Sequence, residues 1–403
     1  MVVDLSSRAA YEAFEVPPEL IAQHPARPRD SSRLMVVHRS TGRIEHKKFS
    51  DLPEVLKADG RKFSLVLNNS GVRDCLLDAV DPSGAKHVVY LLEEAPAGAG
   101  SSSAGKDEDR AAKRPRADRP AWMCSGESLE KLEEIGKQSP DGIAFRAAGD
   151  DGVEASIRRV GRDGLAEIEF RLAPSGGSPE RTCFQRVEAV LRTPLPPYVL
   201  SRDGDDQYNT VFAKDAGSVA APTAGLHFTE DTLRRCRDDA GCTVDEVTLH
   251  VGYGTFAHIE ADALSEHKMH AERLFLSEST AARLGEHAAA GRALLAVGTT
   301  ATRTLETCAA DTPQGEPASF VPTGAAGKDT ELFIYPDGHD WKAVGALLTN
   351  FHMPGLTPIC LVASFAGAQK GGKYGYDLVM RAYKEAISER YRFFSFGDAM
   401  LVL

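Results

Sequence analysis

The strongest constraint on the fold of this chain is a change in sequence pattern near residue 198. Before it, short runs alternate apolar and polar residues, most clearly in AEIEFRL at residues 166–172. A period of two is typical of strands buried on one face. Further candidate strands are KFSLVLNN, KHVVYLLEE, VEASIRRV and FQRVEAVL. Their spacing predicts an all-β module, a small barrel over residues 60–192, followed by the stiff TPLPPY at residues 193–198.

After residue 198, apolar runs alternate with helical patterns, which predicts an α/β domain. The C-terminal helix is the clearest element, because its apolar residues recur at spacings of three and four along one stripe. These residues are Leu378, Val379, Ala382, Tyr383, Ala386 and Ile387. Thr229, followed by two acids, predicts a helix N-cap, and Gly291 predicts the end of a helix.

Residues 95–120 interrupt the all-β module with APAGAGSSSAGKDEDRAAKRPRADRP. Alanine is the largest apolar residue in this segment, so it cannot bury enough surface to offset the entropy of ordering. We therefore predict a disordered surface loop.

Charge and composition exclude several classes of protein. No stretch approaches the roughly 18 apolar residues of a membrane helix, and the acidic start does not resemble a secretory signal; we expect a cytoplasmic protein. Lys and Arg total 47 against 58 Asp and Glu, a formal charge of -11, which argues against binding nucleic acid through bulk charge but leaves a local basic cleft open. The seven cysteines are scattered without a CxxC pair and are expected to be free thiols.

Three polar side chains stand out as candidates for proton transfer. His227 lies in SVAAPTAGLHFTE, just before the predicted helix start. His352 lies in LLTNFHMPG, and Asp398 lies in YRFFSFGDAML, both within apolar context. Histidine titrates near neutrality, and burial shifts a pKa. Each residue is equally consistent with a satisfied structural hydrogen-bond network, and for a lone histidine that is the commoner role.

A second group of candidates suits an anion. In LLAVGTTATRTLE a buried strand turns at Gly298 into a helix, which exposes Thr299 and Thr300 beside Arg303. The amide groups of a helix N-terminus, two hydroxyls and a guanidinium predict a pocket for a carboxylate or phosphate. No GxxxxGK and no GxGxxG fingerprint is present, which argues against a P-loop or a dinucleotide enzyme.

Glycines and histidines mark two further segments. In TLHVGYGTF, Gly252 and Gly254 allow a ligand close to the backbone, although a bulge fits equally well. In EHKMHAE, His267 and His270 lie three residues apart, but zinc needs a third protein ligand. We therefore expect no metal, and a surface or substrate-facing pair instead.

Several of these segments closely resemble the S-adenosylmethionine:tRNA ribosyltransferase-isomerase family of queuosine biosynthesis. The resemblance rests on ELIAQHPARPRDSSRLMVVHR, HKKFSDLPEVL, SVAAPTAGLHFTE, TLHVGYGTF, AVGTT and LLTNFH. It covers most of the chain outside the all-β module. It implies a mixed α/β catalytic domain built from both ends of the chain, residues 1–59 and 193–403, with a β-barrel inserted at residues 60–192.

The resemblance also implies a reaction. S-adenosylmethionine (AdoMet) donates its ribosyl group to the aminomethyl group of 7-aminomethyl-7-deazaguanine in tRNA, the ribose is isomerised to an epoxycyclopentanediol, and adenine and methionine leave. A monomer and no metal are implied.

Such chemistry needs a base beside the sulfonium, an acid for adenine and a pocket for a carboxylate. Our hypothesis assigns proton transfer to His227, His352 and Asp398. The residues predicted to bind AdoMet are Thr223, Gly225, Gly252, Gly254, Thr299, Thr300, Arg303 and Asn350.

Two alternatives remain open on the sequence. The chain departs from the family pattern where basic residues are usual, for instance at Ala257 and at Asp203, Asp205 and Asp206. Neutralised phosphates supply much of the affinity for nucleic acid. The alternatives are a catalytically silent homologue that binds AdoMet, a nucleoside or a protein partner, and a ribosyltransferase with a small-molecule acceptor.

Overall fold

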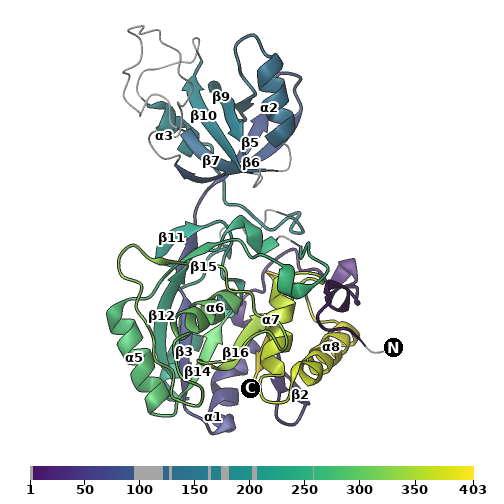
Figure 1. Ribbon diagram of the computed structural model, residues 1–403, viewed down its shortest axis with the longest axis vertical. Coiled ribbons are helices and arrows are strands. Elements are labelled where there is room, and N and C mark those ends of the chain that lie inside the picture. Colours follow the sequence, from purple (N-terminus) through teal and green to yellow (C-terminus); the bar gives the residue numbers. More distant parts are fainter. Residues whose placement is uncertain are drawn as a thin grey trace. The chain divides into compact units, whose positions relative to one another are not determined.

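The chain forms two compact units in a computed structural model (Figure 1). The structure describes residues 3–94, 121–126, 129–161, 165–173, 181–201, 207–256 and 258–403. One unit comprises Met1–Val72 together with Leu195–Leu403, and the other comprises Arg73–Pro194. The loop predicted at residues 95–120 lies outside the described residues.

A mixed sheet forms the centre of the first unit. Among the described residues it has nine strands, in the order β15 (Lys328–Thr330), β13 (Glu272–Phe275), β12 (Thr243–Leu249), β3 (Phe63–Asn68), β14 (Ala293–Val297), β16 (Val344–Asn350), β17 (Ala399–Val402), β1 (Arg33–His38) and β2 (Arg43–Lys48). The strands from β12 to β16 run parallel, and β17 and β2 are antiparallel to β16 and β1. A short pair of strands, β4 (Ser70–Val72) and β11 (Asp215–Ser218), lies outside this sheet.

Strand β3 corrects the predicted domain boundary. The segment KFSLVLNN was assigned to the all-β module, yet β3 pairs with β12 and β14 in the middle of the main sheet. All six of its residues are buried. Its near-continuous apolar run is typical of a parallel strand covered on both faces. The all-β unit therefore begins at Arg73, and not at residue 60.

Helices cover both faces of the main sheet, so the unit has three layers. Helices α1 (Leu52–Asp59) and α4 (Glu230–Asp238) pack against one face. Helices α5 (Glu278–Ala289), α6 (Thr299–Cys308), α7 (Thr357–Ala366) and α8 (Gly372–Ser388) pack against the other. Alternate residues of each central strand point into the two cores, as in Leu65 and Val66. This confirms the predicted α/β class.

Local signals for helix ends are confirmed. The predicted apolar stripe lies on α8, with Leu378, Val379 and Ala382 buried. Thr229 caps α4, since its hydroxyl accepts the backbone N–H of Thr232 at 3.1 Å. Gly291 follows α5 with a φ of 72°, a conformation that favours glycine.

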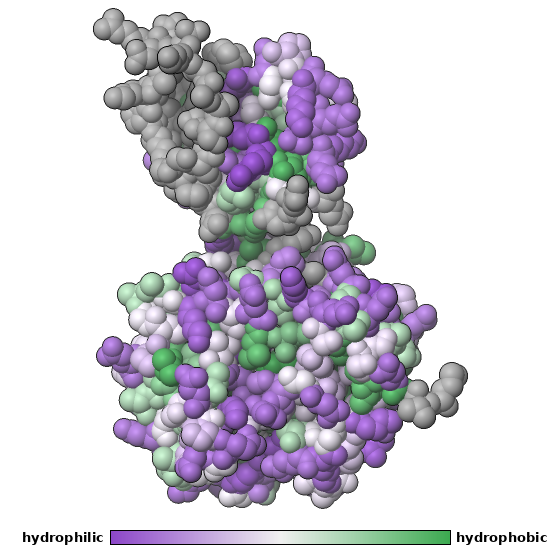
Figure 2. Space-filling model, in the orientation of Figure 1, coloured by the Kyte–Doolittle hydropathy of each residue, from purple (hydrophilic) through white to green (hydrophobic). Residues whose placement is uncertain are grey.

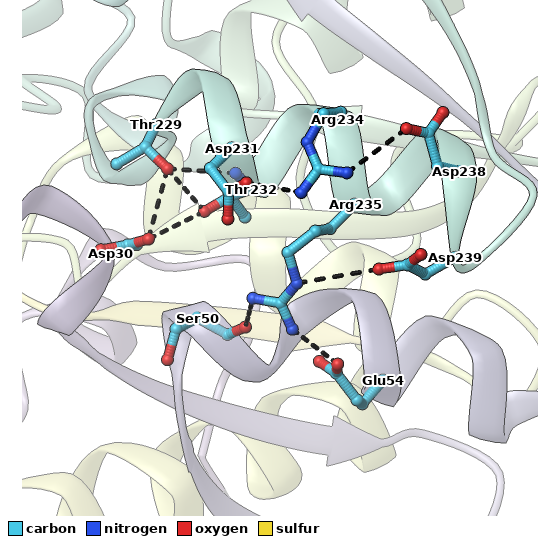
Figure 3. Close-up of polar contacts among 10 residues, drawn as sticks. All are labelled: Asp30, Ser50, Glu54, Thr229, Asp231, Thr232, Arg234, Arg235, Asp238 and Asp239. Atoms are coloured by element: carbon cyan, nitrogen blue, oxygen red, sulfur yellow. Dashed lines mark hydrogen bonds and ion pairs between the residues drawn. The ribbon is translucent and has the colours of Figure 1, made fainter.

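Hydrogen bonds and ion pairs connect α4 to neighbouring segments of the chain (Figure 3). Arg235 donates to the Glu54 carboxylate at 2.6 Å and to the Ser50 carbonyl at 3.1 Å. The hydroxyls of Thr229 and Thr232 donate to the same oxygen of Asp30, at 3.2 and 3.0 Å. Figure 3 also shows Arg234 between Asp231 and Asp238. Two of the arginines of α4 are thus already ion-paired.

The second unit contains a closed barrel. Over the described residues its six strands follow the order β10 (Ala166–Leu172), β7 (Ala121–Ser125), β6 (Lys86–Glu94), β5 (Leu76–Val80), β8 (Phe145–Ala147) and β9 (Asp150–Val160). Closure removes exposed strand edges. Helices α2 (Leu129–Gln138) and α3 (Cys183–Glu188) contribute Leu132 and Val187 to its core.

Helix α3 corrects a second prediction. The sequence predicts a strand for FQRVEAVL, but its first five residues are helical. The hydroxyl of Thr182 caps the helix by accepting the N–H of Gln185 at 3.2 Å, and the Gln185 side chain accepts the N–H of Thr182 at 3.0 Å. This capping box precedes a segment too short for its period to be diagnostic.

The surface of the first unit is mostly hydrophilic on the face drawn in Figure 2, with a small hydrophobic area near its middle. None of the described helices is both long and apolar enough to cross a membrane. None of the seven cysteines forms a disulfide, as predicted, and all seven are buried. The remaining short helices are η1 (Arg8–Tyr11), η2 (Pro18–Leu20), η3 (Arg29–Ser31), η4 (Phe49–Asp51), η7 (Thr223–His227), η8 (Tyr253–Phe256) and η9 (Leu264–Glu266).

Candidate active site

A cleft with two adjoining cavities lies within the first unit, where parallel strands β14 and β16 end. The tyrosine cavity, which contains Tyr198 and Tyr208, measures about 680 Å³ out to its open mouth. The ion-pair cavity, which contains Glu272 and Arg303, measures about 690 Å³ in the same way. The carboxyl edge of parallel strands is the usual place for small-molecule ligands in such sheets.

The two cavities share four residues, so they form one elongated cleft. The shared residues are Thr255, Thr299, Thr300 and Pro358. Of the residues predicted from sequence, the tyrosine cavity also contains Thr223, Asn350 and His352, and the ion-pair cavity also contains Gly254 and Arg303.

Helix α6 points its N-terminus into the cleft. Gly298 precedes it with a φ of 93°, a conformation that residues with a Cβ rarely adopt. The first bond of the helix runs from the Thr302 N–H to the Gly298 carbonyl at 3.1 Å. The N–H groups of Thr299 and Thr300 therefore have no acceptor within the helix, and the helix dipole favours an anion beside them.

Asn350 is held rigidly at the end of β16. Its Oδ1 accepts from the Thr223 hydroxyl at 3.1 Å, and its Nδ2 donates to the Phe394 carbonyl at 3.3 Å. The same Nδ2 donates to Nε2 of His227 at 3.1 Å. An amide with its orientation set by three partners can present a fixed polar surface to a ligand.

His227 lies behind Asn350 and does not line either cavity. Because Nε2 accepts from Asn350, the ring proton lies on Nδ1, which donates to the Ser32 hydroxyl at 2.8 Å. The ring stacks on Phe49 with centroids 5.0 Å apart. Burial, together with the positive charges of Arg392 and Arg29, lowers the pKa of His227 to about 3. The imidazole is therefore neutral, and both of its nitrogens are occupied.

His352 does line the cleft. Its Nε2 lies 2.7 Å from the Thr349 hydroxyl, and its backbone N–H donates to the Tyr383 hydroxyl at 2.8 Å. Burial lowers its pKa to about 3, so this ring is also neutral. In the described part of the chain, no group forms a hydrogen bond with its Nδ1. His352 thus combines a position in the cleft with a nitrogen available for a proton.

Arg303 is not a free cation. It forms a buried ion pair with Glu272 and donates to the carbonyls of Leu332 at 2.9 Å and Thr330 at 3.2 Å. Glu272 also accepts the backbone N–H of Gly252 at 2.9 Å. The positive charge predicted to attract an anion is therefore offset by a carboxylate.

Glu272 was missed as a site residue in the sequence analysis. A signal was present, because Glu272 lies two residues before Leu274 in one strand, and both side chains are buried on the same face while Arg273 between them is exposed. A carboxylate on the buried face of a strand needs a cationic or hydrogen-bonding partner. The partner, Arg303, lies 31 residues away.

Three other predicted residues lie outside the cleft lining. Asp398 accepts the backbone N–H groups of Arg33 at 2.9 Å and Arg392 at 2.8 Å, which ties β1 to the segment before β17. Gly225 packs closely against Phe212. Gly252 supports Glu272, as described above.

The two predicted histidines of EHKMHAE line the ion-pair cavity. His267 lies edge-on to the Phe333 ring with centroids 5.1 Å apart, and burial lowers its pKa. The ring of His270 lies against Gly254, leaving no space for a Cβ there. Within the residues that the structure describes, no group of three potential metal ligands occurs.

Comparisons with known proteins give a consistent result. Residues 10–402 match a family described as queuosine biosynthesis protein. The S-adenosylmethionine:tRNA ribosyltransferase-isomerase of Thermotoga maritima is 39% identical over 393 residues, covering 97% of this chain and 98% of that protein. The enzyme of the same name from Symbiobacterium thermophilum is 39% identical over 395 residues, with the same coverage.

A solved structure is also similar. It is the crystal structure of S-adenosylmethionine tRNA ribosyltransferase from Thermotoga maritima, 31% identical in sequence. The match covers 98% of this chain and 100% of that one, with a TM-score of 0.46.

Proposed function

Because this chain belongs to the queuosine biosynthesis protein family, we infer that it is an AdoMet-dependent tRNA ribosyltransferase-isomerase. It transfers the ribosyl group of AdoMet to the aminomethyl group of 7-aminomethyl-7-deazaguanine in tRNA and isomerises it. Adenine and methionine are released, and the product is epoxyqueuosine-tRNA. The full-length similarity to enzymes of that name supports the activity.

The proposal extends to the organisation of the enzyme. Both ends of the chain form the catalytic α/β domain, and the barrel unit is a domain inserted into it. The enzyme acts in the cytoplasm, as its N-terminal sequence predicts, and as a monomer, as the family resemblance implies. AdoMet is the ribosyl donor, and no metal takes part.

The proposed site rests on one observation. The N-terminus of α6, whose first N–H groups have no acceptor within the helix, lies in the same cleft as a neutral histidine, His352. The amino-acid end of AdoMet bears a carboxylate, which suits the unoccupied N–H groups of Thr299 and Thr300 at the start of α6. The ion-pair cavity adjoins these N–H groups and contains the polar side chains of Glu272 and Arg303, which suits the charged amino-acid end of AdoMet better than the tyrosine cavity does. We therefore place the methionine end in the ion-pair cavity.

His352 is the proposed proton acceptor. With the methionine end in the ion-pair cavity, the sulfonium falls near the threonines that the two cavities share. Nδ1 of His352 is available there, and the neutral ring can take a proton from the carbon beside the sulfonium. The positive sulfonium would itself disfavour a protonated histidine until the proton is transferred.

His227 and Asp398 are proposed as positioning residues. His227 fixes Asn350, and Asp398 fixes the backbone on which Phe394 and Ser395 enter the tyrosine cavity. Arg303, Gly252 and Gly225 act in the same indirect way, through Glu272 or through loop packing. Thr223 holds the amide of Asn350.

The two alternatives, a silent homologue and a ribosyltransferase with a small-molecule acceptor, gain no support from the cleft. Departures from the family pattern at residues 203, 205, 206 and 257 lie outside the described residues. The residues that would handle AdoMet are present in the cleft and ordered by hydrogen bonds.

Mass spectrometry tests the function directly. The purified protein is mixed with AdoMet and a tRNA that carries 7-aminomethyl-7-deazaguanine, and both the modified nucleoside and free adenine are followed. We expect the epoxycyclopentanediol product and equal amounts of adenine. Adenine without modified tRNA would indicate another acceptor, and AdoMet binding without either product would indicate a silent homologue.

Two variants separate the proposed roles of the histidines. His352→Gln should lower kcat by about 100-fold or more, the usual contribution of a general base, with AdoMet affinity within a few-fold of the unaltered enzyme. His227→Gln should lower kcat less, because it displaces Asn350 without removing a reacting group. Unchanged turnover in His352→Gln would contradict the base assignment, and unchanged turnover in His227→Ala would exclude any role for that residue.

A further inference from the structure

The tyrosine cavity contains a buried hydroxyl without a partner. Tyr208 is 1% exposed and lines the cavity. Its hydroxyl lies near the Ser395 side chain and the Ala221 backbone, but neither forms a hydrogen bond of good geometry with it. The nearby Ser395 hydroxyl is instead bonded to the Tyr198 hydroxyl at 2.6 Å. Buried polar groups of native proteins nearly always have a partner. In a ligand cleft, such a group can receive its missing bond from a bound ligand or from an ordered water.

The surroundings of Tyr208 indicate the chemical class of that ligand group. The rings of Tyr198 and Phe394 line the same cavity, with centroids 4.9 Å apart. No Asp, Glu, Lys or Arg is among the residues that line this cavity. Aromatic walls with a few hydrogen-bonding groups suit a flat, uncharged heterocycle. The charged groups of the cleft, Glu272 and Arg303, lie in the other cavity.

We propose that Tyr208 is a ligand-binding residue whose hydroxyl donates a hydrogen bond to the adenine ring of AdoMet in the tyrosine cavity. The identification of the ligand as AdoMet rests on the proposed function. The location of the binding group, and its need for a hydrogen-bond partner, follow from the position and burial of the Tyr208 hydroxyl. AdoMet is then bound at both of its ends: its adenine lies beside Tyr208, and its amino-acid group lies beside Thr299 and Thr300.

The state of the hydroxyl suits this role. Burial raises the pKa of Tyr208 far above its ordinary value, so the group remains an O–H donor. Ring nitrogens of adenine are acceptors, and they gain electron density as adenine departs from the ribose. A donor aimed at such a nitrogen binds the leaving group more strongly as the bond breaks.

Tyr208→Phe tests the inference, because it removes the hydroxyl and keeps the ring. The probes are AdoMet and adenosine, with affinities measured by isothermal titration calorimetry. We expect the affinity for both probes to fall about ten-fold, the usual effect of one hydrogen bond. The free variant should melt at the same temperature as the unaltered enzyme or higher, because an unsatisfied buried group has been removed.

Tyr376→Phe is the matched control. Tyr376 is also buried, but its hydroxyl donates to the Ala10 carbonyl at 2.8 Å, and it lines neither cavity of the cleft. This variant should have a lower melting temperature and unchanged affinity for AdoMet. A purely structural role for Tyr208 would give the same pattern as Tyr376.

Three outcomes would count against the inference. If Tyr208→Phe bound AdoMet with unchanged affinity, the inference would be wrong, even if the affinity for tRNA fell. A lower melting temperature with unchanged affinity would do the same. If the unaltered enzyme bound no AdoMet, the proposed function would fail and the adenine assignment with it, so the two failures are distinguishable.

Discussion

At the scale of single residues, the chemistry of the cleft depends on which of the two imidazoles, His227 or His352, has a ring nitrogen that no described residue occupies. Both nitrogens of His227 are occupied by Asn350 and Ser32. His352 uses one nitrogen toward Thr349 and keeps the other. Both rings are neutral, since burial lowers the pKa of each to about 3. Hydrogen bonding, rather than charge state, therefore separates the positioning residue from the proton acceptor.

His227 should make the stability of the protein depend on pH. Its pKa in the folded state is about 3, against 6.5 for a free histidine. Below pH 6.5 the unfolded chain binds a proton that the folded one does not, so stability falls as the pH is lowered toward 3. The loss attributable to His227 should be on the order of 2 kcal/mol at pH 5 relative to pH 7.

Urea unfolding at pH 7, 6 and 5 measures this loss. His227→Gln should show a smaller decline than the unaltered protein, and its remaining decline should reflect His352 and other groups. Equal declines in the two proteins would show that His227 is protonated in the folded state.

At the scale of elements, the junction between β14 and α6 positions the anion-binding end of the cleft. The strand ends at Val297 and the helix begins at Thr299, so one residue must reverse the chain. That residue is Gly298, with a φ of 93°. Its conformation starts α6 where Thr299 and Thr300 line both cavities.

Gly298→Ala should therefore weaken AdoMet binding. A Cβ at this position would meet the Ala224 Cβ at 3.6 Å and the Thr300 hydroxyl at 3.8 Å, both ordinary contacts, so the strain comes from the backbone. We expect a loss of about 1–3 kcal/mol in stability and at least a ten-fold loss in AdoMet affinity as the helix start shifts.

Gly291→Ala is the matched control for this substitution. Gly291 has a φ of 72°, and a Cβ there would meet nothing within 4 Å. It should lose stability without losing affinity for AdoMet. Equal affinity losses in the two variants would show that global destabilisation, and not the helix start, weakens binding.

At the scale of the whole molecule, the cleft belongs to a single unit. Every residue that lines either cavity falls within Leu195–Leu403. The chain leaves this unit after Val72 and returns at Leu195, and both residues belong to one hydrophobic cluster with Tyr208. The barrel unit has a separate core of its own.

A chain in which residues 73–194 are replaced by a short Gly/Ser linker should therefore still bind AdoMet. We expect an affinity within about three-fold of the full chain, because the two ends to be joined already lie in one cluster. Calorimetric titration measures the affinity, and circular dichroism checks that the shortened chain is folded. A folded chain without affinity for AdoMet would show that the barrel unit contributes to the site.

Local features of this protein could be determined from its sequence alone. The stripe on α8, the Thr229 cap and the turn at Gly298 depend on residues within one or two helical turns, so periodicity and capping rules suffice to find them. The segments that form the cleft were identified from glycine, hydroxyl and histidine residues at the ends of apolar runs, and Thr299, Thr300, Asn350 and His352 all line it. The capping box at the start of α3 was also local, but the segment that follows it is too short for its period to be diagnostic.

Only the tertiary structure decided how distant segments meet. It placed β3 in the main sheet, paired Glu272 with Arg303, and turned His352 into the cleft while enclosing His227 behind Asn350. Each of these outcomes depends on strand order and on contacts between residues tens to hundreds of positions apart. A local pattern reports which face of an element is buried, whereas the partner on that face is set by the packing of the whole unit.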